Sequence, residues 1–225
     1  MDKSIKQGVV AELISLLEDG NAHVTFEYAC ADLTPELWNQ RLPDAPYTIW
    51  QLVEHLRIAQ WDIAEFCLDP QHVSPAWPAG YWPAPGATAD EQTWLAALAQ
   101  ISTDRHRFIE LLQAEGTDLL VPLAHGTGQT ILREALLIGD HAAYHTGEII
   151  LLRRLLHAWE EAIVPAVSQL VAPKREGPGT IGVPGPSRLR KAVRTRDVRL
   201  RGSHGAAPCR VFNQLLFDSG QLLRS

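Results

Sequence analysis

Cysteine and methionine are scarce in this chain of 225 residues, and long uncharged apolar runs are missing. Three cysteines, Cys30, Cys67 and Cys209, are an odd number at wide spacing, which excludes a disulfide framework and favours a reducing compartment. No stretch approaches the roughly 18 apolar residues that a membrane span needs. The first 20 residues form an amphipathic pattern with acidic side chains and not a secretory signal. We therefore expect a cytoplasmic protein without a membrane partner.

Positive charge is also scarce over most of the chain. Residues 1–171 hold nine basic against 23 acidic residues, whereas residues 172–225 hold eleven basic against three acidic ones. The junction, Pro173 to Ser187, alternates proline with glycine and cannot propagate a helix or strand. The sequence predicts a folded domain over 1–160 and a disordered basic tail over 161–225. Because the tail lacks interleaved aromatic residues and the acidic body repels polyanions, we do not expect nucleic acid as a partner.

Apolar residues recur at helical spacing through most of the first 160 residues, and no segment alternates as a strand does. Four long helices are expected: Val9 to about Gly20, Thr48 to Pro70, Thr88 to Leu112, and Thr130 to about Trp159. Thr48-Ile-Trp-Gln51 and Thr88-Ala-Asp-Glu91 resemble capping boxes that open the second and third of them. Two shorter helical pieces are expected around Phe26 and after Thr34. These elements predict an all-α fold, a four-helix bundle.

Three histidines lie where they could meet in the core of such a bundle. His141 and His145 are four residues apart on one apolar helix face, which places their Cβ atoms about 5–6 Å apart. His55 lies inside the apolar stripe of the second long helix. Three converging imidazoles would hold Zn, Ni, Cu or Fe and leave positions open for water or substrate. Alternatively, each ring is a core histidine satisfied by a hydrogen bond. No glutamate follows His141, so the chain lacks the arrangement of a zinc peptidase.

Polar and aromatic neighbours of these histidines suggest further roles. Asp62 and Glu148 follow His55 and His145 by seven and three residues, close enough to orient ligands, although both could be ordinary surface groups. Trp77, Tyr81 and Trp82, in the proline-rich loop over residues 70–87, either roof the metal pocket or simply cover the end of the bundle.

Tyr144 and His125 are the candidate catalytic residues. Tyr144 could donate a proton to a substrate on the metal, or be a structural tyrosine. His125 lies in the loop that leads into the ligand helix, or is a plain loop histidine. Cys30 and Cys67 lie in apolar helical segments and are expected to be inert core thiols. The remaining histidines are expected at the surface: His23, His72, His106, His157 and His204.

Two segments carry a family resemblance, one from Ile49 to Asp62 around His55 and one from Asp140 to Ile149 around the histidine pair. Together they resemble the DinB-like (DinB/YfiT) metalloprotein superfamily over about residues 5–160. The resemblance implies a four-helix bundle with a three-histidine divalent metal site on His55, His141 and His145, and a homodimer. Chains of this kind normally stop near the last helix, so the tail departs from the pattern.

The resemblance also implies a range of activities, because the superfamily includes thiol S-transferases that use bacillithiol, mycothiol or glutathione, mycothiol-dependent maleylpyruvate isomerases, and members without an assigned reaction. With the residue pattern, it favours a metal-dependent thiol S-transferase acting on small electrophiles. The expected cofactor is a divalent ion (Zn, Ni or Fe), with a low-molecular-weight thiol as cosubstrate and a small molecule as substrate. Two alternatives stay open: a metal-dependent hydrolase of a small molecule, which consumes no thiol, and a non-catalytic metal-binding stress-response protein.

Overall fold

The structure, a computed structural model, describes residues 2–159. Their elements are α1 (Lys3–Asp19), α2 (Phe26–Cys30), α3 (Pro35–Asn39), α4 (Ile49–Leu68), the 3₁₀ turn η1 (Ala79–Tyr81), α5 (Glu91–Gln113) and α6 (Ile131–Leu155). Within this range the only β pairing is an isolated bridge between Pro122 and Thr130. The all-α expectation is therefore confirmed. The tail expected over residues 161–225 lies outside the described part of the chain.

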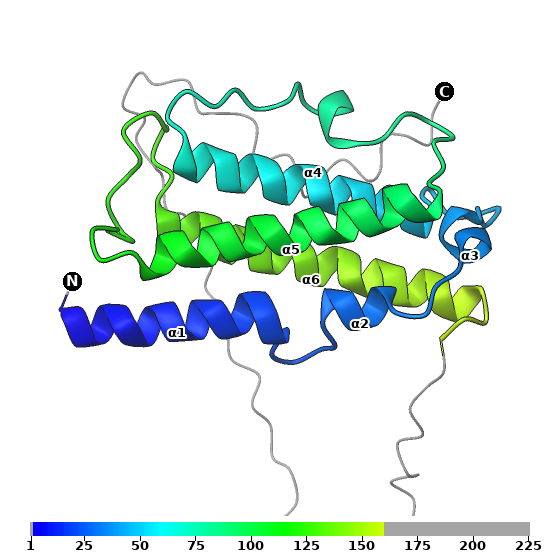
Figure 1. Cartoon of the computed structure of the whole chain (residues 1–225), viewed down its shortest axis with the longest axis horizontal. Coiled ribbons are helices and arrows are strands. Elements are labelled where there is room, and N and C mark those ends of the chain that lie inside the picture. Colours follow the sequence, from blue (N-terminus) through cyan, green and yellow to red (C-terminus); the bar gives the residue numbers. More distant parts are fainter. Residues whose placement is uncertain (1, 160–225) are drawn as a thin grey trace, which may run out of the picture. The chain divides into compact units, whose positions relative to one another are not determined.

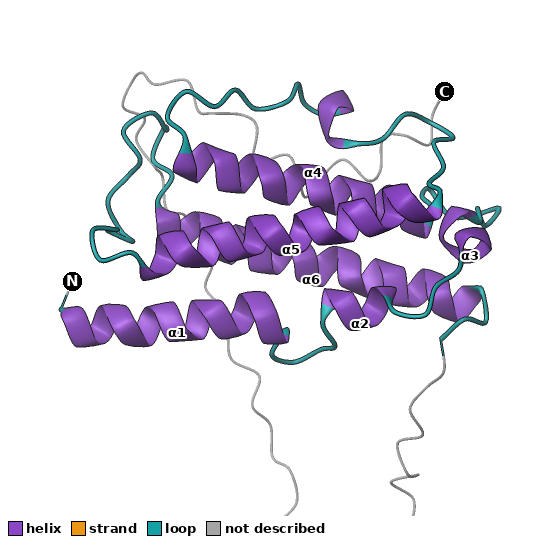
Figure 2. Ribbon diagram, in the orientation of Figure 1, coloured by secondary structure: helices purple, strands orange, loops and turns teal. Residues whose placement is uncertain are grey.

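The four long helices α1, α4, α5 and α6 run side by side, while α2 follows α1 along the same side and α3 lies at one end (Figures 1 and 2). Helix α4 packs against both α5 and α6, while α1 packs against α6 and α5. The short helix α2 lies on α6, and α3 lies on α4. No described helix has the length and apolar character that crossing a membrane requires.

Most helix ends follow from local sequence. Thr48 opens α4 with a complete capping box, as expected, because Gln51 returns its side chain to the Thr48 backbone. Helix α1 ends at Gly20, which adopts a φ of 70° that glycine tolerates without strain. The capping box expected at Thr88 was wrong: Asp90 caps α5 by accepting from the Thr93 backbone N–H. Helix α6 stops at Leu155, short of the expected end near Trp159.

Two apolar clusters fill the interior. The first joins the beginning of α4 to the end of α6 and the beginning of α5, and includes Leu52, Leu56, Trp94, Ile149 and Leu152. The second joins the end of α4 to the beginning of α6 and to α1, and includes Leu13, Ile63, Phe108, Ala135 and Ile138. Since opposite ends of α4 and α6 share each cluster, the two helices run antiparallel. The middle of both helices, between the clusters, carries the three histidines.

Candidate metal centre

Three imidazole rings meet between α4 and α6. His55, His141 and His145 are 2%, 8% and 6% exposed, so all three are buried. The Nε2 atom of His141 lies 3.1 Å from that of His55 and 3.0 Å from that of His145. Among the described residues, this is the one group of three or more metal-binding side chains whose ligand atoms lie within 4.8 Å of one another. The structure therefore brings together the three residues that the sequence nominated.

In two of the rings, Nδ1 is the outer nitrogen, which faces away from the other histidines, and its hydrogen bond determines where the ring proton lies. His55 Nδ1 lies 2.8 Å from the backbone oxygen of Tyr81, and His145 Nδ1 lies 2.7 Å from a carboxylate oxygen of Glu148. Both oxygens can only accept, so each Nδ1 carries the proton. In a neutral ring the Nε2 atom then presents its lone pair, and both lone pairs point at the Nε2 atom of His141. This outer-nitrogen contact is the arrangement that metal-binding histidines show.

Burial keeps protons off the rings. It lowers the pKa of His55 to about 4, although the hydrogen bond to the Tyr81 carbonyl opposes the shift and His145 adds to it. Burial also lowers the pKa of His141 well below 6.5, and the two neighbouring imidazoles act in the same direction. A metal binds only the neutral form of imidazole. The site therefore holds His55 and His141 in the metal-binding form at neutral pH.

The nitrogen arrangement fits a bound divalent ion. A ring proton on His141 Nε2 could serve only one of its two close contacts, so at least one pair of nitrogen atoms meets without a proton between them. Two nitrogens bound to one ion at 2.0–2.1 Å lie about 2.8–3.4 Å apart for ordinary coordination angles. The two distances to His141 Nε2, 3.0 and 3.1 Å, fall in that range, and the three ligand atoms all lie within 4.8 Å of one another. The three histidines could hold a metal ion, which would neutralise the repulsion between their lone pairs.

Aromatic rings cover one side of the centre. Trp82 stacks on His55 with ring centres 4.0 Å apart and planes 1° apart, and its centre lies 6.3 Å from that of His145. Tyr47 stacks on the opposite face of the tryptophan at 4.4 Å. Trp77 packs on the ring of Tyr81 rather than on a ligand histidine. The structure therefore places the Trp82 ring at the centre, as the sequence suggested, while Tyr47 is a neighbour that sequence reasoning missed.

Tyr144 contacts the centre directly. Its ring lies edge-on to His145 at 4.9 Å, and 48% of the residue is exposed, so it is not a buried structural tyrosine. Burial raises the pKa of the Tyr47 hydroxyl, and its neighbours Glu148 and Tyr144 raise it further. Two phenols and one carboxylate therefore gather beside the ligand pair on α6.

The other candidate, His125, lies elsewhere. It is exposed, its Nε2 atom lies 2.7 Å from the backbone oxygen of Phe66, and its ring contacts the Phe66 ring. It is not part of the histidine group. A loop can precede a ligand helix without approaching the ligands, because the two ligand positions lie three turns into α6.

The two residues expected to orient the ligands differ in how they act. Glu148 contacts His145 directly. Asp62 does not contact His55; it is fully buried and accepts from the Tyr81 hydroxyl at 2.5 Å and from His72 Nε2 at 2.7 Å. The surface assignment of His72 was therefore wrong, since its side chain is only 10% exposed.

Among the remaining expectations, three histidines are exposed as predicted: His23, His106 and His157. His204 lies outside the described residues. Cys30 and Cys67 are buried, and burial raises the pKa of both thiols, so neither is an activated nucleophile.

Comparison with known families agrees with this geometry. The sequence profile of the DinB superfamily matches residues 21–149, more than half of the chain and all three histidines. Comparisons with curated proteins and with solved structures give no match. The matched segment, the all-α fold and the buried histidines agree with one another, and the chain belongs to the DinB superfamily.

Proposed function

We propose that this chain is a metal-dependent thiol S-transferase acting on small electrophiles, built on a DinB/YfiT-type four-helix bundle. The single observation that carries the proposal is the convergence of three buried imidazoles, two of which, His55 and His145, have their outer nitrogens held by hydrogen bonds. When bound there, a divalent ion (Zn, Ni or Fe) would lower the pKa of a thiol and favour its thiolate at neutral pH.

The two cysteines in the described part of the chain favour a reaction in which the thiol comes from a cosubstrate. Cys30 and Cys67 are buried and their pKa values are raised, so neither can attack an electrophile at neutral pH. In the proposed reaction the sulfur of a low-molecular-weight thiol forms a bond to an electrophilic carbon. The leaving group departs with its bonding pair, and the thiol proton passes to solvent or to a nearby base.

The exposed side of the centre offers groups for the substrate. Tyr144 is half exposed beside His145, and its hydroxyl is a candidate donor to the departing group. Glu148 holds the His145 ring and adds a negative charge beside the ligands. The Trp82 ring covers His55 and excludes water from that face.

The test combines metal-loaded full-length protein with a panel of small thiols and an activated aryl halide. The consumption of the thiol and of the aryl halide is followed. We expect thiol loss to match product formation, to require metal, and to vanish in His145→Ala. His125→Ala is the matched control, because this histidine lies outside the group and should leave turnover unchanged.

Two results of this test would replace the proposal. Hydrolysis of a small substrate without thiol consumption would make the chain a metal-dependent hydrolase. Stoichiometric metal binding without any turnover would favour a non-catalytic metal-binding protein. The homodimer stays a prediction that gel filtration with light scattering can test.

A further inference from the structure

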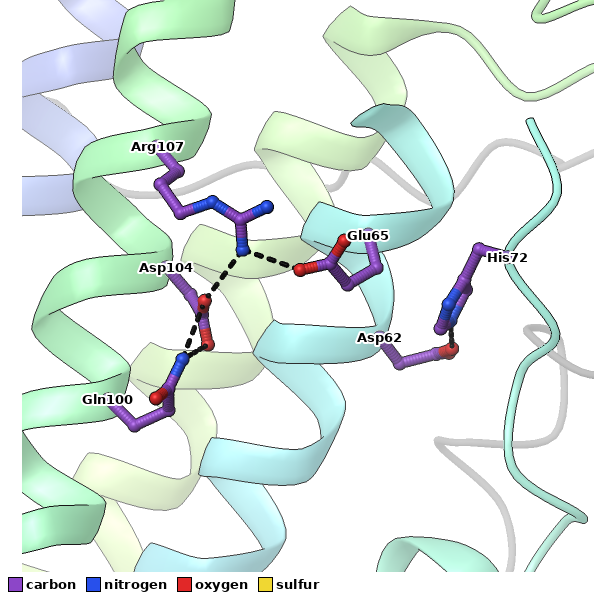
Figure 3. Close-up of polar contacts among 6 residues, drawn as sticks. All are labelled: Asp62, Glu65, His72, Gln100, Asp104 and Arg107. Carbon is purple, nitrogen blue, oxygen red and sulfur yellow. Dashed lines mark hydrogen bonds and ion pairs between the residues drawn. The ribbon is translucent and has the colours of Figure 1, made fainter. Parts of the chain in front are cut away.

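The loop between α4 and α5 is tied back onto the helix that it leaves. Asp62, on α4, is 0% exposed and accepts two hydrogen bonds from this loop. One comes from His72 Nε2 at 2.7 Å, drawn in Figure 3, and the other comes from the Tyr81 hydroxyl at 2.5 Å. One buried carboxylate therefore fixes the loop at two points that are nine residues apart in sequence.

The fixed segment is the one that touches the metal ligand His55. The backbone oxygen of Tyr81 accepts from His55 Nδ1 at 2.8 Å, and the next residue, Trp82, stacks on the same ring at 4.0 Å. The backbone contact and the ring contact on His55 thus come from two consecutive loop residues.

Tyr81 spans the distance between Asp62 and His55. The aspartate follows the histidine by seven residues, or two helical turns, so both lie on one face of α4. The tyrosine hydroxyl reaches the aspartate while its carbonyl reaches the histidine, and its ring is fully buried between them. Helix α4 therefore holds both ends of this residue.

We infer that Asp62 is a positioning residue of the metal centre, acting on His55 through Tyr81. The inference rests on the metal-binding part of the proposed function. Asp62 holds the loop so that the Tyr81 carbonyl keeps the proton on His55 Nδ1 and the lone pair on Nε2, where it faces the other two ligands. Loss of a hydrogen bond to the outer ring nitrogen of a ligand histidine typically weakens metal binding by about 10–100-fold.

A second buried aspartate provides a matched control. Asp104 on α5 is also 0% exposed and accepts from Gln100 and from Arg107, which in turn pairs with Glu65 on α4 (Figure 3). The hydrogen bonds that Asp104 accepts come from residues of its own helix and not from the loop or a candidate ligand histidine. Its replacement removes a buried carboxylate with two donors, as replacement of Asp62 does, but leaves the metal centre untouched.

The experiment compares Asp62→Leu with Asp104→Leu in the full-length chain. Affinity for Zn²⁺ is measured by competition with a chromophoric chelator, and folding by circular dichroism. We expect both variants to lose stability, Asp62→Leu to bind zinc about 10–100-fold more weakly, and Asp104→Leu to bind it within about threefold of wild type. Asp62→Asn keeps an acceptor for the Tyr81 hydroxyl and should restore most of the affinity.

Two further measurements cover a variant that fails to fold and separate the inference from the proposed function. Tyr81→Phe removes only the hydroxyl contact and should weaken zinc binding in the same direction. Nitrogen-15 NMR of the metal-free chain should show the proton of His55 on Nδ1 in wild type and a mixture of tautomers in Tyr81→Phe.

If wild type binds no zinc, the proposed function fails, but the NMR result still supports or overturns the role of Asp62. Wild-type affinity and an unchanged tautomer in both Asp62→Leu and Tyr81→Phe would overturn it, as would equal weakening in Asp104→Leu.

Discussion

Helices α4 and α6 carry buried ionisable residues in two layers, and the layers differ in chemistry. The histidine layer holds His55 on α4 and His141 on α6. The carboxylate layer holds Asp62 and Glu134, each seven residues from the histidine of its own helix. Burial disfavours the charged form in both layers. It therefore lowers the pKa values of the two histidines and raises that of Glu134 to about 7, where the Asp62 charge adds to the effect and Arg133 opposes it.

The layers also differ in how their polar atoms are satisfied. In the histidine layer, a Tyr81 carbonyl fixes the outer nitrogen of His55, and the inner nitrogens face one another. In the carboxylate layer, Asp62 receives two hydrogen bonds, whereas the Oε2 atom of Glu134 is buried without a partner among the described residues. The comparison teaches that nitrogens gathered around a common point suit a cation, while a buried carboxyl with one oxygen left unpaired favours its protonated form.

The largest expected effect is on metal binding. His145→Ala removes one of three ligands and leaves too few protein ligands for the sites that hold catalytic zinc. We expect the variant to lose its metal to an equimolar mild chelator, with zinc affinity at least about 100-fold weaker. The helical fold should persist, because the apolar clusters do not include this residue. Equilibrium dialysis measures the metal and circular dichroism measures the fold; retention of stoichiometric zinc would remove His145 from the site.

The next effect is on stability in the carboxylate layer. Burial raises the pKa of Glu134 from the ordinary 4.5 of a glutamate to about 7, so folding takes up a proton between these pH values. Its stabilising contribution is full below pH 4.5 and is lost as the pH rises through 7. The free energy of unfolding of Glu134→Gln minus that of wild type should therefore be about 2–3 kcal/mol larger at pH 8 than at pH 4.5.

Urea unfolding of the metal-free chain at several pH values measures this difference. The histidine layer supplies the contrast, because the lowered pKa values of His55 and His141 make their contribution fall as the pH drops below 6.5. An identical pH profile for wild type and Glu134→Gln would show that this carboxyl titrates normally, and the contrast between the layers would fail.

A smaller effect concerns the aromatic cover of the histidine layer. Trp82 stacks on His55, so a paramagnetic ion such as Co²⁺ or Ni²⁺ at the centre should quench its fluorescence. We expect Trp82→Phe to lose most of the metal-dependent quenching while still binding metal. Trp61→Phe is the control, because that ring packs on His72 and not on a ligand histidine. Undiminished quenching in Trp82→Phe would place the ion away from this ring.

The smallest effect is expected from the C-terminal region. The described residues 2–159 supply two apolar clusters and the three candidate ligands, which is enough for a core and a metal site. A chain ending at Glu160 should therefore keep the Tm of the full chain to within a few degrees and its full metal content. Loss of metal or unfolding of the shortened chain would show that the domain boundary at residue 160 is wrong.

Sequence reasoning found the three candidate ligands because a helical period links them to the core. His55, His141 and His145 occupy apolar faces of long helices, and the all-α fold follows from the same pattern. The capping box at Thr48 was equally readable, since both of its partners lie within four residues. Local chemistry of this kind needs no knowledge of tertiary contacts.

The contacts that control His55 could not be predicted in the same way. His72 was expected at the surface because it lies in a loop, yet it donates to Asp62 ten residues earlier. Tyr81 acts through its backbone oxygen, a group that every residue possesses. Tyr47 reaches Trp82 across 35 residues of sequence. Such contacts depend on the path of a loop, and no residue period encodes that path.

The most direct test of the central claim is metal content together with the ligand atoms of the bound ion. Full-length protein is loaded with Zn²⁺, dialysed, and examined by elemental analysis and X-ray absorption spectroscopy. The account predicts one zinc per chain with three imidazole nitrogens at about 2.0–2.1 Å, and none retained in His141→Ala. Zinc that binds wild type and His141→Ala equally, or a spectrum with fewer than three imidazoles, would contradict it.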